Sequence, residues 1–278
     1  MTFRRLAIAD GLHIACLDAG PLRQRRAPPL TLLHGIGADR AEWVLSLPLL
    51  MLHRRVLAFD LLGHGRSSKP DVAGVDFRIR LLTDTVVSAI EALPEPPASV
   101  DVLGHSLGGA VALDLASRYP RLVRRLVLVD AAGLPPTEAL DPSAISLPFA
   151  PGSFQESRRL LRASVHSRLL NNVVMALGAR LYKGRHRNRP QLLKLLASIA
   201  AGEDAMSAED LARLTHETLI LWGDRDRIFP LATGERLQQL LPNARLVVLP
   251  KCGHVAPAER PIAFARQVTG FLDAAPGR

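Results

Sequence analysis

Six short apolar runs spaced along the chain constrain its fold more than any other feature of the sequence. Several are continuous stretches of Val and Leu, which is typical of strands covered on both faces. Helical patterns separate most of them, and strands that alternate with helices form a mostly parallel sheet. The sequence therefore predicts an α/β protein with helices on both faces of the sheet. The runs cover residues 30–35, 56–60, 100–106, 126–130, 218–224 and 245–250.

The first 19 residues predict two further strands. A basic pair and the apolar residues after it resemble the start of a signal peptide, but Asp10, Gly11 and His13 interrupt the run. An Asp-Gly dipeptide between apolar stretches is typical of a tight hairpin turn. This hairpin and the six later runs give an expected sheet of eight strands, and we expect a cytoplasmic protein.

The alternation of strands and helices breaks between Asp130 and Thr218. The intervening residues show helical patterns, and their first part is rich in Pro, which suits a hinge or a loop over a pocket. We expect an inserted helical cap at 134–214, on a core formed by 1–133 and 215–278 that is long enough to bury a substantial interior.

The 278 residues carry a formal net charge of +9 at pH 7. Nine basic residues lie within 158–189, with only Glu156 nearby against them. Such a cluster either attracts an anionic substrate or forms a solvated helical face, and the sequence leaves both open. The segment lacks the repeated aromatic residues that stack on bases, so nucleic acid is not an expected partner.

Membrane, redox and metal chemistry are not indicated by the sequence. No apolar run reaches the roughly 18 residues of a transmembrane helix, so no membrane insertion is expected. Cys16 and Cys252 are two distant thiols, which suggest neither a disulfide framework nor a metal site. We expect no cofactor and no metal ion.

Residues 100–116, VDVLGHSLGGAVALDLA, place Ser106 in a G-x-S-x-G motif. A nucleophilic serine of this kind requires a strand running into a sharp turn and a helix running out of it. Apolar residues before the motif and a helical pattern after it supply both. Gly104, Gly108 and Gly109 remove Cβ atoms where the helix passes close to the strand. Ser106 is the predicted nucleophile, although the short motif alone also fits a turn serine.

A serine hydroxyl reacts only when a base accepts its proton and a carboxylate orients that base. His254 follows the last predicted strand, at the carboxyl edge of the sheet. The sharp turn that carries Ser106, called the elbow below, is expected at the same edge. The loop WGDRDRIFP offers Asp224 and Asp226. Asp224 is nearer the strand end and suits a turn-capping role, so Asp226 is the expected acid. Asp130, which ends another strand, is the competing acid.

Two backbone amides are the expected oxyanion donors. The N–H of Leu107 lies at the start of the elbow helix, where the helix dipole favours negative charge. The N–H of Ile36 lies in a Gly-bracketed turn after a strand. His34 in that turn is expected to be structural, and His105 is too close to Ser106 in sequence to reach the same point.

Together these motifs resemble the α/β-hydrolase superfamily, of the capped type. In that family the usual order is nucleophile, acid and histidine, which the resemblance assigns to Ser106, Asp226 and His254. It also implies a structural role for His64. The resemblance runs through HGIGADRAEW (34–43), AFDLLGHGRSSKP (58–70), GHSLGG (104–109), LILWGDRDRIFP (219–230) and CGHVAPAERP (252–261).

The resemblance also separates reaction types. Haloalkane dehalogenases and epoxide hydrolases place Asp at the elbow, where this chain has Ser106. Carbon-carbon hydrolases of aromatic ring-fission products usually carry Trp after the catalytic histidine, where this chain has Val255.

We therefore expect a carboxylic ester hydrolase that acts on small hydrophobic acyl substrates through an acyl-enzyme. Carbon-carbon hydrolysis is the alternative, and a non-catalytic ligand-binding protein is a third reading. An apolar pocket wall is expected from cap residues including Phe149, Phe154 and Met175.

Overall fold

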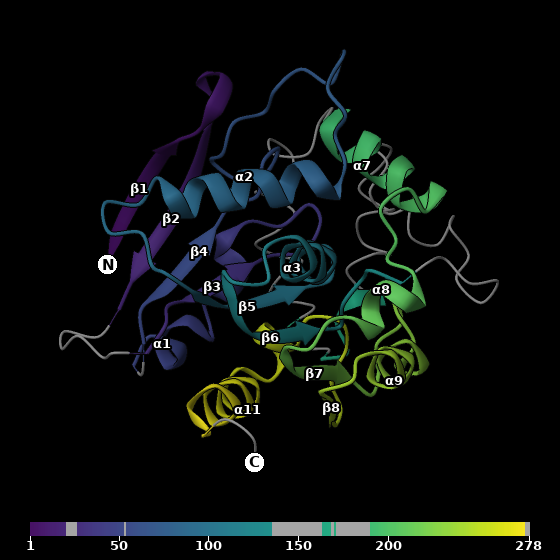
Figure 1. Ribbon diagram of the computed structural model, residues 1–278. Coiled ribbons are helices and arrows are strands. Elements are labelled where there is room, and N and C mark those ends of the chain that lie inside the picture. Colours follow the sequence, from purple (N-terminus) through teal and green to yellow (C-terminus); the bar gives the residue numbers. More distant parts are fainter. Residues whose placement is uncertain (21–26, 53, 135–162, 168–169, 171–189, 276–278) are drawn as a thin grey trace.

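The computed structural model describes residues 1–20, 27–52, 54–134, 163–167, 170 and 190–275. Within them an open eight-stranded sheet carries helices on both faces (Figure 1). The strand order is β1-β2-β4-β3-β5-β6-β7-β8. The strands are β1 (Thr2–Ala7), β2 (His13–Ala19), β3 (Leu30–Leu33), β4 (Val56–Phe59), β5 (Val100–His105), β6 (Val123–Val129), β7 (Glu217–Gly223) and β8 (Ala244–Leu249).

The predicted α/β architecture is confirmed. β4, β3, β5, β6, β7 and β8 are parallel, and every residue of β3, β4 and β5 is buried, as their largely apolar sequences predict. The described helices are α1 (Leu47–Leu50), α2 (Ile79–Glu91), α3 (Leu107–Arg118), α7 (Pro190–Ala201), α8 (Ala208–Ala212), α9 (Leu231–Leu240), α10 (Ala256–Glu259) and α11 (Pro261–Asp273), with short 3-10 turns η1 (Ala9–Gly11) and η2 (Arg40–Trp43).

The first two strands form the predicted hairpin. β1 pairs with β2 in antiparallel register, and β2 continues antiparallel onto β4. In the connecting turn Asp10 and Gly11 have φ angles of 59° and 68°. Asp and Gly are the residues that adopt this left-handed conformation most readily, so the dipeptide fixes the reversal.

The two faces of the sheet are covered by separate hydrophobic cores. Side chains of α2, α3 and α9, such as Leu82, Val111 and Leu237, pack on one face. α1 and α11 cover the other face, where Leu50 and Phe264 are fully buried. Figure 1 shows these two groups of helices on opposite sides of the strands. The sheet therefore lies between two hydrophobic layers, and this packing holds the loops at its edges in place.

Part of the predicted cap region, 134–214, is described. α7 packs on the loop that precedes α2: Gln191 donates to the Pro70 carbonyl at 2.6 Å, and Lys194 donates to the Val72 carbonyl at 3.1 Å. The expected wall residues Phe149, Phe154 and Met175 and all nine basic residues of 158–189 lie outside the described residues. Among the described helices, none combines the length and the apolar character needed to cross a bilayer.

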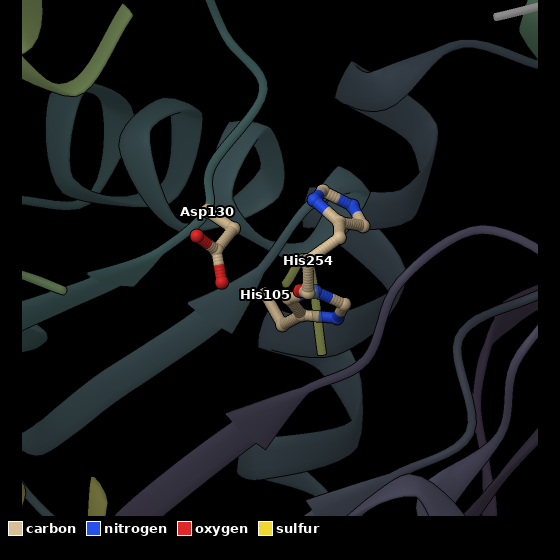
Figure 2. A group of neighbouring side chains, drawn as sticks. All are labelled: His105, Asp130 and His254. Atoms are coloured by element: carbon tan, nitrogen blue, oxygen red, sulfur yellow. The ribbon is translucent and has the colours of Figure 1, made fainter. Parts of the chain in front are cut away.

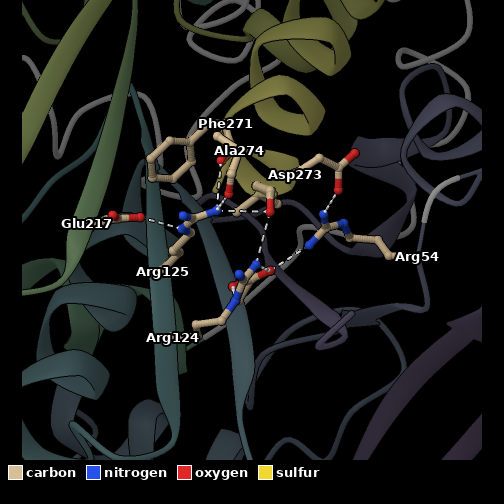
Figure 3. Close-up of polar contacts among 9 residues, drawn as sticks. Arg54, Arg124, Arg125, Glu217, Phe271, Asp273 and Ala274 are labelled. Atoms are coloured by element: carbon tan, nitrogen blue, oxygen red, sulfur yellow. Dashed lines mark hydrogen bonds and ion pairs between the residues drawn. The ribbon is translucent and has the colours of Figure 1, made fainter. Parts of the chain in front are cut away.

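Buried arginines fasten the C-terminus of α11 to the sheet (Figure 3). Arg125 on β6 is 3% exposed and donates through Nη1 to the carbonyls of Phe271, Leu272 and Ala274 at 2.9–3.0 Å. Its Nε lies 2.6 Å from Glu217 on β7. The guanidinium therefore donates to carbonyl groups that have no hydrogen-bond partner within the last turn of a helix.

A second cluster completes this attachment. The buried carboxylate of Asp101 on β5 accepts from Arg54 and from Arg124 at 2.6–2.7 Å, and Arg54 also pairs with Asp273 of α11. Because the charges are paired and hydrogen-bonded, they can be buried at this edge.

We expect Arg125→Ala to lower the free energy of unfolding by about 3 kcal/mol, because three helix-end carbonyls lose their donor and a buried side chain is truncated. Urea denaturation followed by circular dichroism measures the change. The exposed Arg121 is the matched control, and Arg121→Ala should leave the midpoint unchanged. Equal midpoints for both variants would show that the arginine does not hold the helix.

Candidate active site

Ser106 occupies a sharp turn between β5 and α3. Its φ of 51° and ψ of −116° lie in a region that residues with a Cβ rarely adopt. The turn is held by bonds from the Ser106 amide to the Val129 carbonyl at 3.0 Å, and from the amides of Gly109 and Ala132 to the Ser106 carbonyl. The predicted strand, elbow and helix are thus present, with the serine 8% exposed.

The glycines around Ser106 permit a very close approach of backbone segments. A Cβ on Gly104 would lie 2.1 Å from the Gly108 carbonyl oxygen, and one on Gly108 would lie 2.1 Å from the Leu33 oxygen. A Cβ on Gly109 would lie 2.4 Å from the side chain of Ala131. These positions have the role that the sequence predicted, because any larger residue would push α3 away from β3 and β5.

His254 and Asp226 meet at the carboxyl edge of the sheet. The His254 Nδ1 lies 2.8 Å from Asp226 Oδ2, and both side chains are buried. Asp226 Oδ1 accepts from the amides of Ile228 and Phe229, which fixes the carboxylate. Since an ionised carboxylate only accepts, Nδ1 carries the proton and Nε2 is left with a lone pair that can accept one.

The turn that contains Ile36 lies against the elbow. A Cβ on Gly35 would lie 3.4 Å from the Ser106 Cβ. In the described part of the chain, the amides of Ile36 and Leu107 donate no hydrogen bond. Nor does a hydrogen bond join the Ser106 hydroxyl to the His254 ring among these residues. Such bonds often tighten only when a substrate is bound.

The structure pairs His254 with Asp226 and not with the competing acid. Asp130, with a φ of 43°, ends β6, and its Oδ1 accepts from the Gly223 amide at 2.8 Å. Its Oδ2 is buried and has no partner among the described residues. Burial, reinforced by the charge of Asp226, raises the pKa of Asp130 well above its usual range. Asp224 accepts from the Cys252 amide of the loop that follows β8.

Figure 2 shows His105, Asp130 and His254 as neighbouring side chains. The rings of the two histidines are 4.9 Å apart, and one ligand atom from each of the three residues lies within 4.8 Å of the others. This set does not suit a cation, because both nitrogens of His105 and the Nδ1 of His254 already contact protein groups.

The other histidines of the motifs are structural, as predicted. His34 Nδ1 donates to the Gly35 carbonyl at 2.7 Å, and its Nε2 accepts from the Leu61 amide at 3.0 Å. His64 is buried beside it, with ring centroids 5.0 Å apart. Cys16 and Cys252 are buried free thiols, and burial raises the pKa of both, so they stay protonated and inert.

The family model for the alpha/beta hydrolase fold matches residues 28–261, which include every segment of this site. The chain belongs to the α/β-hydrolase fold family. A 2-hydroxymuconate semialdehyde hydrolase of Pseudomonas sp. (strain CF600) is 36% identical to it over 96% of this chain and 93% of that one. Lipase 3 of Moraxella sp. (strain TA144) is 27% identical over 88% of this chain and 77% of that one.

Solved structures agree with this assignment. A meta-cleavage product hydrolase from Pseudomonas fluorescens IP01, solved with bound acetates, has a TM-score of 0.81 and 28% identity, with 96% of each chain covered. The chain is therefore a hydrolase with the α/β-hydrolase fold, and its relatives include both carbon-carbon bond hydrolases and lipases.

Two carboxylates of this α/β-hydrolase site were not predicted from the sequence. Glu42 lies 2.6 Å from His105 Nδ1 and accepts from the Gly35 amide at 3.1 Å. Glu259 accepts from the Gly253 amide and from the amides of residues 166 and 167, all at 2.9 Å. Both residues lie within motifs that carry the family resemblance, RAEW and APAERP. This resemblance was the sequence signal that could have identified them.

We expect Gly108→Ala to destabilise the hydrolase by about 3 kcal/mol, because the new Cβ overlaps the Leu33 oxygen and the backbone must shift. Urea denaturation measures this loss. Gly270 in α11 has nothing within 4 Å of a built Cβ, so Gly270→Ala should instead raise stability by about 0.5–1 kcal/mol. Similar stabilities for the two variants would contradict the close approach at the elbow.

Proposed function

We propose that this hydrolase cleaves a carbon-carbon bond in a conjugated 2-hydroxy-dienoate of the kind produced by aromatic ring fission. The observation that carries the proposal is the 36% identity, over nearly the whole of both chains, to a 2-hydroxymuconate semialdehyde hydrolase. The comparisons thus favour the alternative that the sequence left open over ester hydrolysis, its main expectation. The +9 net charge suits a substrate that carries a carboxylate.

Ser106, His254 and Asp226 are the proposed catalytic residues. His254 Nε2 takes the proton of the Ser106 hydroxyl as Oγ attacks the carbonyl carbon, and Asp226 stabilises the imidazolium that forms. The 2.8 Å contact and the two amides that hold Asp226 support this assignment, because they fix the ring with Nε2 unprotonated. The amides of Ile36 and Leu107, which lack protein acceptors in the described chain, are proposed to bind the oxyanion.

The bond changes balance with water as the only co-reactant. The dienol first takes its keto form, in which the carbon next to the reacting carbonyl is protonated. Attack by Ser106 gives a tetrahedral oxyanion, whose collapse breaks the carbon-carbon bond. The electron pair leaves into the conjugated oxo-acid, which becomes a dienolate and takes the proton from His254. Water, deprotonated by His254, then hydrolyses the acyl-Ser106 ester to a carboxylic acid.

The predicted cap at 134–214 is proposed to close over this site and to select the substrate. Its described segment 163–167 is tied to the catalytic loop, because the His254 amide donates to the Ser164 carbonyl at 2.7 Å. Val255 stands where such hydrolases usually carry Trp, and because the Val side chain is smaller we expect a bulkier acyl end to be accepted.

The reaction type is tested by comparing a 2-hydroxy-6-oxo-dienoate with p-nitrophenyl butyrate. We expect kcat/KM for the dienoate to exceed that for the ester by about 100-fold, because a polar site matched to its substrate rejects one that leaves its groups unpaired. Spectrophotometric assays of both reactions measure the ratio. Ser106→Ala is the control and should abolish both activities. Faster turnover of the ester would instead support ester hydrolysis, which Val255 and the lipase relatives favour.

The two carboxyl groups near His254 give a matched pair of variants. Asp226→Asn should lower kcat by about 10⁴-fold, because the ring loses the partner that sets its tautomer. Asp130→Asn should lower kcat by less than about tenfold, because Asp130 Oδ1 accepts from the Gly223 amide and neither of its oxygens is hydrogen-bonded to the His254 ring in the described chain. Steady-state kinetics of both variants decide between the acids, and the reverse order of effects would assign the role to Asp130.

A further inference from the structure

His105 and Glu42 form a buried pair next to the proposed nucleophile. The side chain of His105 is 5% exposed and that of Glu42 is 7% exposed, and the two atoms that face each other are 2.6 Å apart. Neither residue takes part in the proton transfers described above. Burying an ionisable group costs free energy unless an opposite charge and hydrogen bonds compensate it, so the contacts of this pair determine its charge.

The contacts of His105 fix where its protons lie. Its Nε2 is 2.7 Å from the backbone carbonyl of His254, and a carbonyl only accepts, so Nε2 carries a hydrogen. A neutral ring would then present the lone pair of Nδ1 to the Glu42 carboxylate at 2.6 Å. Two acceptors do not approach so closely without a proton between them. The pair therefore holds one additional proton and is an imidazolium in ionic contact with a carboxylate, although the two facing atoms do not meet hydrogen-bond geometry in the described chain.

The charges around the ring agree with this protonation. Burial alone would lower the pKa of His105, but Glu42 raises it to about 9, and Asp130 and the His254 carbonyl act in the same direction. The His254 ring, 4.9 Å away, is hydrogen-bonded to Asp226. The imidazolium is thus stable at neutral pH and is lost as the pH rises through about 9.

The other end of the pair reaches the proposed oxyanion turn. Glu42 Oε2 accepts from the Gly35 amide at 3.1 Å, one residue before Ile36. A Cβ on Gly35 would lie 3.0 Å from His105 Nδ1, so turn and ring are in contact. One ion pair therefore touches three segments far apart in sequence: the turn at Gly35, the elbow at His105 and the loop of His254.

We propose that the His105–Glu42 ion pair is a positioning device that holds the His254 loop and the Ile36 amide in register with Ser106. This inference rests on the proposed catalytic roles of those residues. A charged N–H donor makes a stronger hydrogen bond to the His254 carbonyl than a neutral one. Loss of the additional proton of His105 sets the Nδ1 lone pair against the carboxylate, and the three segments separate.

Glu42→Gln tests the charge without removing the contacts. The Gln amide can donate to Nδ1 of a neutral His105, and its oxygen can still accept from the Gly35 amide. We expect kcat of this variant to stay within about tenfold of the wild type at pH 7. Glu42→Ala removes both contacts and should lower kcat by about 100-fold with little change in KM, because the reacting groups are misplaced while the pocket remains.

The pH profile is the readout that a merely structural role would not move. The rate constant for labelling of Ser106 by a fluorophosphonate should fall in the wild type as the pH rises through about 9. This alkaline limb should be absent in Glu42→Gln, in which no carboxylate holds the additional proton on His105. Glu217→Gln, which neutralises the remote pair with Arg125, is the matched control and should keep the wild-type profile. Circular dichroism verifies that each protein is folded across the range.

The outcomes separate the two proposals. If the folded wild type is not labelled at all, both the proposed function and the positioning role are overturned. If it is labelled but Glu42→Gln keeps the same alkaline limb, or if Glu42→Ala keeps the wild-type kcat, the positioning role alone is overturned. A limb present in the wild type and in Glu217→Gln but absent in Glu42→Gln supports the pair.

Discussion

The close approach of α3 to β3 and β5 is the constraint on which the rest of the site depends. No Cβ fits between the Gly108 backbone and the Leu33 carbonyl, so the helix begins directly above the strands. This position forces Ser106 into a φ of 51°, and it leaves the first amide of α3 without a partner in the described chain. The backbone strain at Ser106 is maintained because hydrophobic cores pack against both faces of the sheet.

The parallel sheet then determines which side chains can meet. β3, β5, β6 and β7 all end at the same edge, so the turn at Gly35, the elbow, Asp130 and the loop of Asp226 converge there although they are far apart in sequence. The opposite edge carries the arginine attachments of α11. The contacts that anchor α11 and the residues of the candidate site thus lie at opposite ends of the same strands. The anchored sheet can therefore hold strained backbone and buried charge at its carboxyl edge.

The strands, the Asp-Gly hairpin and the Asp226–His254 contact could be predicted because each depends on local residue patterns or on strand order. Continuous apolar runs identify buried strands, and Asp10-Gly11 favours positive φ whatever surrounds it. Glu42 and Glu259 could not be predicted in this way. Nothing in RAEW or APAERP distinguishes a solvated Glu from a buried one. Their roles arise from loops that approach only after folding, and so does the difference between Asp130 and Asp226.

The environments of these groups explain how several buried acids coexist around one histidine. Asp226 accepts from two backbone amides, whereas Asp130 has one amide and an oxygen without a partner among the described residues, and burial raises its pKa. Glu42 stays ionised because His105 carries the matching proton. Beside His254, the Asp226 carboxylate is directed at Nδ1. A carboxylate in this position favours an imidazolium during proton transfer, which the proposed general-base role of His254 requires.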